Sequence, residues 1–340
     1  MRARLSRRSF LSGIGIGGLA ALRPSRAAAA DFYQGKTLTM IVGFAPGGGV
    51  DSQARIIARH LVRFIPGQPA IVVQNMEGAA GAVAANYINR VGPEGLVVST
   101  PGRSWFLDGV IKGASIGFDP TKFTYIGSAG GSNSVLYLRT ATGIASLDEL
   151  KSARRTVTCG SLASTTPTAM VPQMLAALGM PVKVVLGYVS TARVLVALEQ
   201  GEVDGMFTVA DSFARRQDLI ANRVIAPILQ SKPALPGVPV LRDDVIPASQ
   251  RGLLDLVMCT DSFGLPLVAP PGIPVERREI LRKAFVAMTA DKDYQADAAK
   301  ADLPVGAPIE GAELAAMIDA IAASATPEIV AAYRRLASAK

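Results

Sequence analysis

Short runs of β-branched residues alternate along this chain with longer stretches that are apolar on one side only. Residues 38–44 suit a strand, residues 46–49 interrupt it with Pro and Gly, and residues 54–65 carry apolar side chains at the spacing of a helix face. The same order of strand, loop and helix repeats from residue 70 and again from residue 96. This rhythm is typical of α/β folds with largely parallel sheets.

A second series of strands and helices follows a Gly-Gly break at residues 130–131. We place the crossover to a second domain there, and we expect residues 263–269 to form a strand that returns to the first domain. The expected domains are residues 31–132 with 264–340, and residues 133–263. Strands expected in the second domain cover 134–138, 156–160, 182–188, 203–208 and 224–229, and closing helices cover 275–289 and 312–323.

The first 30 residues predict a cleavable export signal. They hold six Arg and no acidic residue, an apolar stretch over residues 11–22, and four Ala before Asp31. Twelve apolar positions are too few to span a bilayer, which needs about 20. The run Ser6-Arg7-Arg8-Ser9-Phe10-Leu11 resembles a twin-arginine export motif. An ordinary secretory signal with a chance Arg pair is the alternative.

Composition indicates a globular protein, with 49% hydrophobic and 18% charged residues among the 340. The formal charge of +8 suggests an anionic partner at first, but the export segment contributes six of these charges. The rest of the chain has 29 basic and 27 acidic residues, so we expect no nucleic-acid partner. One His and two Cys are too few for the usual zinc sites, and we expect neither a metal nor a cofactor.

Loops that follow the expected strands are rich in Gly, Ser and Thr and hold a single basic residue, Arg103. In open α/β sheets ligands bind beyond the carboxyl ends of the strands. Several of these loops run into a helix, whose first N–H groups lack partners and bind an anion such as a carboxylate. Ordinary turn and cap chemistry is the alternative for any single loop. Three Gly after Pro46 need a stronger reason, such as close approach of the backbone to a ligand.

Two carboxylates invite different interpretations. Asp51 stands where a helix begins, and we expect it to cap that helix. Asp204 lies inside an apolar segment, where a buried carboxylate needs a partner. A ligand and a neighbouring side chain are equal alternatives for that partner.

A periplasmic hydrolase is a rival function. Its nucleophile would be Ser161 or Cys159, and His60, the single histidine, would have to be its base. We instead expect His60 on a solvated helix face. Cys159 and Cys259 lie in apolar, strand-like segments, and we expect buried thiols, with a disulfide as the alternative.

Four segments, in this order, resemble the motif series of the tripartite tricarboxylate transporter substrate-binding receptors, also called Bug receptors. They are Phe44-Ala45-Pro46-Gly47-Gly48-Gly49-Val50-Asp51, Gly78-Ala79-Ala80-Gly81, Gly201-Glu202-Val203-Asp204-Gly205-Met206-Phe207 and Leu235-Pro236-Gly237-Val238-Pro239. The resemblance covers nearly the whole chain after the export signal. Two departures are Met76-Glu77, where Arg-Pro is common, and Ser262, where Trp is common. The first departure makes a tricarboxylate ligand doubtful.

The resemblance implies an α/β, two-domain periplasmic-binding-protein-like fold with a ligand cleft between the domains. It implies a periplasmic, monomeric receptor without catalytic activity. Such a receptor would capture a small mono- or dicarboxylate, aromatic acids and amino acids included, and deliver it to a two-subunit integral-membrane permease. A receptor of this shape that reports to a sensor kinase is the alternative. The ligand-binding residues it implies are Phe44, Ala45, Pro46, Gly47, Gly48, Gly49, Gly78, Ala79, Ala80, Gly81, Ser161, Ser164, Thr165, Thr166, Tyr188, Ser190 and Asp204.

Overall fold

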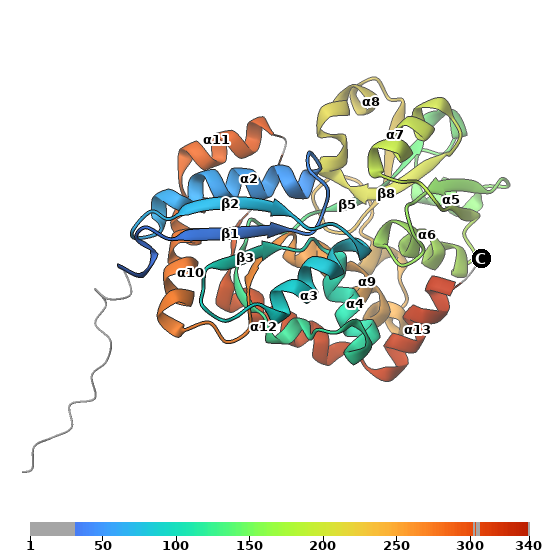
Figure 1. Cartoon of the computed structure of the whole chain (residues 1–340). Helices are drawn as coiled ribbons and strands as arrows, with labels where there is room; N and C mark the ends of the chain where they lie inside the picture. The colour runs from blue at the N-terminus through green and yellow to red at the C-terminus, as the bar shows by residue number, and fades with distance from the viewer. Residues whose placement is uncertain (1–30, 302, 304–306, 339–340) are drawn as a thin grey trace, which may run out of the picture.

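Two lobes, each built on one β-sheet, make up the computed structural model (Figure 1). The structure describes residues 31–301, 303 and 307–338, so the predicted export signal lies outside the described residues. The two-domain α/β architecture expected from the motifs is confirmed. The domain limits stay a prediction, although the strands of each sheet fall inside the expected limits.

The first lobe holds a six-stranded sheet. β1 lies between β2 and β3 and runs parallel to both, with Thr37 opposite Ala70. β10 lies between β3 and β4 and runs antiparallel to both. The strand order is β11 (Ile309–Glu310), β4 (Thr124–Ser128), β10 (Pro266–Ala269), β3 (Val97–Thr100), β1 (Thr37–Val42) and β2 (Ala70–Asn75).

The second lobe holds a five-stranded sheet of similar design. β6 runs parallel to β7 and β8, whereas β5 runs antiparallel to β8 and β9. The sheets are therefore mixed and not largely parallel, because β5 and β10 each enter their sheet from the other lobe. The strand order is β7 (Val182–Val185), β6 (Val157–Gly160), β8 (Gly205–Val209), β5 (Ser134–Arg139) and β9 (Ile225–Gln230).

Alternation along the strands divides the core of the first lobe between two helical layers. Met40 and Val42 pack in one cluster with residues of α2 and α10, while Ile41 packs in the other with α3, α4 and α12. The helices are α2 (Gly49–Leu61), α3 (Ala82–Arg90), α4 (Ser104–Lys112), α5 (Leu147–Ser152), α6 (Pro167–Ala177), α7 (Thr191–Gln200), α8 (Gln217–Ala221), α9 (Arg251–Phe263), α10 (Val275–Thr289), α11 (Lys292–Lys300), α12 (Gly311–Ser324) and α13 (Pro327–Ser338).

The expected strand over 263–269 is wrong in its first part, because Phe263 ends helix α9 and β10 begins at Pro266. Cys259, placed in a strand-like segment by sequence, also lies in α9. The four consecutive apolar residues 256–259 fit either a strand or a helix, because a short apolar run is ambiguous between the two.

The chain crosses between the lobes from β4 to β5 and from α9 to β10. The two crossings are in close contact at Gly264 and Gly130. A Cβ on Gly264 would collide with the carbonyl oxygen of Gly130. Helix α13, in red in Figure 1, packs on α6 and α9, and the Tyr333 hydroxyl donates to the Thr165 carbonyl at 2.7 Å. Within the described residues no single helix is long and apolar enough to cross a membrane; α12 and α13 meet that test only as a pair bent by 84°.

Substituting Gly264 with Ala should destabilise the fold well beyond the cost of its backbone conformation. Gly264 has φ +62°, and Gly272, with φ +73° and open space around it, is the matched control. Ala should cost about 1–2 kcal/mol at either position for the left-handed backbone, and about 1–3 kcal/mol more at Gly264 for the collision with Gly130. Urea unfolding measures both variants, and equal losses would contradict the close crossing.

Candidate ligand-binding site

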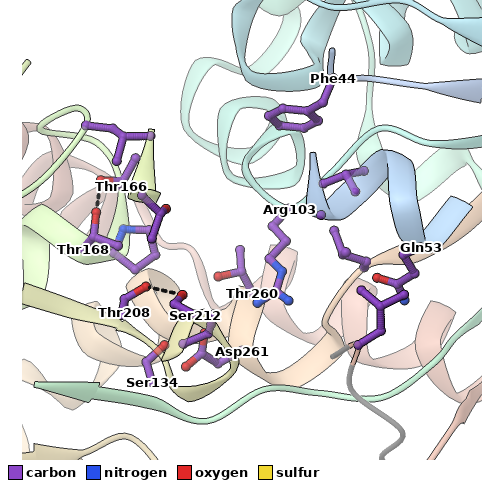
Figure 2. A pocket seen from close by; sticks show the side chains of 18 residues that line it. Phe44, Gln53, Arg103, Ser134, Thr166, Thr168, Thr208, Ser212, Thr260 and Asp261 are labelled. Carbon is purple, nitrogen blue, oxygen red and sulfur yellow. Dashed lines mark hydrogen bonds between the residues drawn. The ribbon is translucent and has the colours of Figure 1, made fainter. Parts of the chain in front are cut away.

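A cavity of about 440 Å³ lies between the lobes (Figure 2). Loops that follow strands β1, β3, β6 and β8 contribute to its walls, and helices α2, α6 and α7 begin at it. Its lining is rich in hydroxyl groups, and Arg103 and Asp261 are its charged members. The lining residues are Phe44, Gly49, Val50, Gln53, Arg103, Ser134, Leu162, Thr166, Pro167, Thr168, Thr191, Thr208, Val209, Ser212, Thr260, Asp261, Leu265 and Leu303.

The loop from β1 to α2 forms the first-lobe wall. Hydrogen bonds to Asp51 hold this loop in place. One carboxylate oxygen of Asp51 accepts hydrogen bonds from the Gly47 N–H and Arg55 Nε, both at 2.9 Å. The other accepts from Asn75 Nδ2 at 2.8 Å, and this nitrogen also donates to the Phe44 carbonyl. The loop is thus held without any side chain of its own.

Asp51 is buried and ionised. Burial acts to raise its pKa, but hydrogen bonds from Arg55, Gly47 and Asn75 outweigh this effect and lower the pKa from 3.8 to about 2. The sequence-based expectation that Asp51 caps α2 is therefore only partly met. It sits in the first turn of α2, where its charge suits the helix dipole, but its backbone partner is Gly47, which precedes the helix.

Hydroxyl groups form the second-lobe wall. Thr166 and Thr168, at the start of α6, hydrogen-bond each other at 2.7 Å, and both contact the buried Ser161 hydroxyl. Thr208 and Ser212 form a second hydroxyl pair at 2.9 Å. Figure 2 shows both pairs on the side of the cavity opposite to Gln53.

Arg103 and Asp261 meet at the floor, where Figure 2 shows the Arg103 side chain reaching towards Thr260 and Asp261. Asp261 is only 3% exposed. Burial raises its pKa above the usual value, although the Ser134 hydroxyl, the charge of Arg103 and the Ser231 hydroxyl act to lower it. This corner of the cavity therefore pairs one cation with one buried acid.

The structure brings three of the predicted site residues to this cavity, namely Phe44, Gly49 and Thr166. Ser161 lies behind Thr166, and Gly47 is bonded to Asp51. Described residues of the predicted set that do not line the cavity are Ala45, Pro46, Gly47, Gly48, Gly78, Ala79, Gly81, Ser161, Ser164, Thr165, Tyr188, Ser190 and Asp204. The side chain of Ala80 lies outside the described part of the structure.

Several of these residues have other structural roles. Gly81 allows close packing on Pro101, because a Cβ there would collide with the Pro101 carbonyl. Tyr188 lines a different, 280 Å³ hollow beside α7. Ser190 caps α7, accepting a hydrogen bond from the Arg193 N–H at 3.3 Å. Its neighbour Thr191 is the residue of that loop that reaches the cavity.

Asp204 stands just before β8, at the end of the strand opposite to Thr208 and Val209. Its carboxylate accepts hydrogen bonds from the Thr158 backbone and side chain at 2.9 and 3.1 Å, and it pairs with Arg155. Burial acts to raise the pKa of Asp204, but these hydrogen bonds outweigh it and the pKa is lowered. The partner that a buried carboxylate needs is thus supplied by the chain.

Sequence reasoning missed Gln53, Ser134, Thr260 and Asp261. Gln53 lies one turn after Gly49 on α2, so the spacing of four residues on one helix face could have found it. Ser134, at the start of a strand, escaped the search for loops that follow strands. Thr260 and Asp261 belong to α9, which the sequence did not predict.

The residues of the rival hydrolase are engaged elsewhere. The His60 ring contacts Asp297 at 3.0 Å and Arg63 at 2.7 Å, and the ring is buried and not on a solvated face as expected. Cys159 and Cys259 are free buried thiols, as expected. Burial raises the pKa of Cys159 to about 12, with the Asp204 charge adding to it, so its thiolate is disfavoured. Among the described residues no group of three His, Cys, Asp or Glu could hold a metal.

Acid should loosen the first-lobe wall through Asp51. Because its folded pKa is lowered, Asp51 adds stability above its unfolded pKa of about 3.9 and loses it as pH falls towards 2, a difference of about 2 kcal/mol. Replacing Asp51 with Asn should remove this part of the acid dependence. Urea unfolding at pH 5, 4, 3 and 2.5 measures it, with Asp148→Asn, at a side chain 94% exposed, as control. A wild-type acid dependence in the Asp51 variant would contradict this role.

Local sequence matches connect the chain to known proteins, while no family model matches it. It is 46% identical over 57 residues to the protein BugT of Bordetella pertussis and 32% identical over 93 residues to a UPF0065 protein of Pseudomonas sp. strain P51. These matches cover 17% and 27% of this chain, and 17% and 26% of the relatives.

Solved structures share the fold over nearly their whole length. A TctC solute-binding protein from Polaromonas matches with a TM-score of 0.67 at 17% identity, covering 89% of this chain and 98% of that one. MatC from Rhodopseudomonas palustris, solved with bound malate, matches with 0.63 at 19% identity, covering 89% and 99%. The periplasmic binding protein BugD matches with 0.62 at 18% identity, covering 89% and 98%. None of these names is that of an enzyme. In local sequence and in fold the chain thus resembles the tripartite tricarboxylate receptors of the Bug family, as its motif series predicts.

Proposed function

We propose that this chain is an extracytoplasmic receptor that captures a small carboxylate between its lobes and delivers it to a two-subunit permease of the tripartite tricarboxylate type. Lobe closure about the two crossings would enclose the ligand. Bound malate in one structural neighbour and adipate in another support the ligand class. The permease step rests on the motif resemblance. Adjacent genes for a large and a small membrane subunit would support it, whereas a sensor kinase gene would favour signalling.

The observation that carries the proposal is the convergence of helix N-termini on one cavity. Helices α2, α6 and α7 begin at its lining, and α4 begins directly after Arg103. Their first N–H groups lack intrahelical partners and carry the positive end of the helix dipole. A carboxylate held between α2 of one lobe and α6 of the other would satisfy donors on both.

The Gly run supports the same conclusion. Gly47 has φ +81° and requires glycine for its backbone. Gly48 and Gly49 do not, since a Cβ on Gly49 would meet no atom within 4 Å and one on Gly48 would meet the Ala45 carbonyl at an ordinary 3.7 Å. Among the described residues nothing requires glycine at Gly49, which lines the cavity, whereas a ligand close to the backbone would.

Native mass spectrometry of protein from the periplasm, followed by thermal-shift screening of carboxylates, tests the proposal. A co-purified acid or a rise in melting temperature with one would support it, because a ligand that binds the native state stabilises it. An absence of both across mono-, di- and tricarboxylates and amino acids would overturn it.

A bulky side chain on Gly49 should block binding and spare the fold. Val at this position should lower affinity for the stabilising acid at least about tenfold, because its methyl groups would occupy space needed by the ligand. Calorimetric titration measures affinity and urea unfolding measures stability. Val at Gly92, an exposed glycine outside the cavity, is the control. Full affinity in the Gly49 variant would show that the loop is only a turn.

A further inference from the structure

Gln53 has a buried polar side chain whose hydrogen-bonding capacity is not fully satisfied by the folded chain. It is 5% exposed and lines the cavity, and its Oε1 has no hydrogen-bond partner. Figure 2 shows its side chain reaching from α2 towards the cavity. An unsatisfied buried acceptor is costly, so a partner supplied by a ligand would recover that loss.

The position of Gln53 on α2 places it close to where we expect the carboxylate of a ligand to bind. Gly49 and Gln53 are four residues apart on α2, and both line the cavity. Side chains at this spacing are neighbours about 5–6 Å apart on one helix face. A ligand whose carboxylate meets the N-terminus of α2 at Gly49 would therefore carry its adjacent carbon towards Gln53.

The charges of the lining also restrict the ligand. Among the described residues of the lining, Arg103 is the only cation and Asp261 the only acid. A second ligand carboxylate would have to share Arg103 with Asp261. A hydroxyl or ammonium group beside the carboxylate would instead find acceptors, in Gln53 and in the hydroxyl groups of Thr208, Ser212 and Thr260.

We propose that Gln53 makes the cavity selective for a carboxylic acid that bears a hydrogen-bond donor on the carbon next to its carboxyl group. The donor is a hydroxyl or an ammonium group, and the unsubstituted acid of the same length is discriminated against. This inference rests on the proposed function, since it assigns selectivity within the same cavity. It moves the selecting role from Asp204 to a residue that lines the cavity.

Two matched series of acids test the proposal by calorimetric titration. Succinate, malate and aspartate share one skeleton, and butanoate, 2-hydroxybutanoate and 2-aminobutanoate share another. The wild-type protein should bind a hydroxy or amino acid of at least one series about tenfold more tightly than the unsubstituted acid. The hydroxy and amino members show which donor is preferred.

Three variants locate the preference. Gln53→Met keeps the length of the side chain without its hydrogen bonds, and should reduce the preference to about twofold or less by weakening binding of the substituted acids more than that of the unsubstituted acid. Gln53→Glu presents acceptor oxygens and should keep the preference. Gln173→Met is the matched control, because Gln173 also has a buried Oε1 without a partner but lies on α6 outside the cavity lining. It should leave every affinity unchanged.

Equal wild-type binding of substituted and unsubstituted acids would overturn this inference and leave the receptor proposal standing. So would a Gln53→Met variant that keeps its preference, or one that weakens all acids alike. A Gln53→Glu variant that loses the preference would also overturn it, because the amide nitrogen would then be the contact. Wild-type protein that binds none of these acids, nor any other carboxylate, would overturn the receptor proposal itself and this inference with it.

Discussion

The carboxyl ends of parallel strands lie at the same edge of a sheet, so the loops that follow these strands all leave from that edge. This constraint determines the chemistry of the cleft. In the first lobe β1 and β3 run side by side, and in the second lobe β6 and β7 do. The helices that follow them therefore begin close together, with their unpaired N–H groups towards the cavity. A cavity built in this way attracts an anion with little formal charge, and Arg103 is the only cation among the lining residues that the structure describes.

Recognition through the backbone needs loops that a ligand can approach closely, so these loops cannot be fixed by bulky side chains of their own. In this chain, residues behind the loops fix them through hydrogen bonds. Asn75, at the end of β2, joins the Phe44 carbonyl to Asp51, and Asp51 holds Gly47. On the second lobe the Ser161 hydroxyl holds the start of α6 through Thr166 and Thr168. Both walls are thereby fixed before a ligand arrives, which reduces the entropy lost on binding.

The sequence predicted most of the fold because several strands are short β-branched runs followed directly by Pro or Gly, as β1 and β3 are. The rule that ligands lie after strands led to Gly49 and Thr166, and the motif resemblance added Phe44; all three line the cavity. It could not lead to Thr260 or Asp261, because both lie inside helix α9 and not in a loop that follows a strand.

Asp204 and Gln53 both show why the sequence alone could not identify the site residues correctly. Asp204 attracted attention as a buried carboxylate, but the partner it needs is supplied by Arg155 and Thr158 at the far end of the strand. Gln53 reads in sequence as one more polar residue of an amphipathic helix, and its lack of a hydrogen-bond partner is visible only in three dimensions. In both cases the role of the residue depends on whether a residue distant in sequence supplies a hydrogen-bond partner. The periodicity of the sequence does not reveal such partners.

In the proposed receptor, Asp261 would connect ligand recognition to movement of the lobes. Its side chain lines the cavity, while its carbonyl accepts hydrogen bonds from the Ser132 N–H and the Lys232 ammonium group, both at 2.8 Å. Ser132 lies on the crossing from β4 to β5, and Asp261 itself lies just before the crossing back to β10. The floor of the cavity and the crossings are therefore one structure. A ligand shifts a conformational equilibrium only by its difference in affinity for the two states. A ligand that reaches from the Gly49 wall to this floor would have such a difference if the proposed closure changes the distance between them.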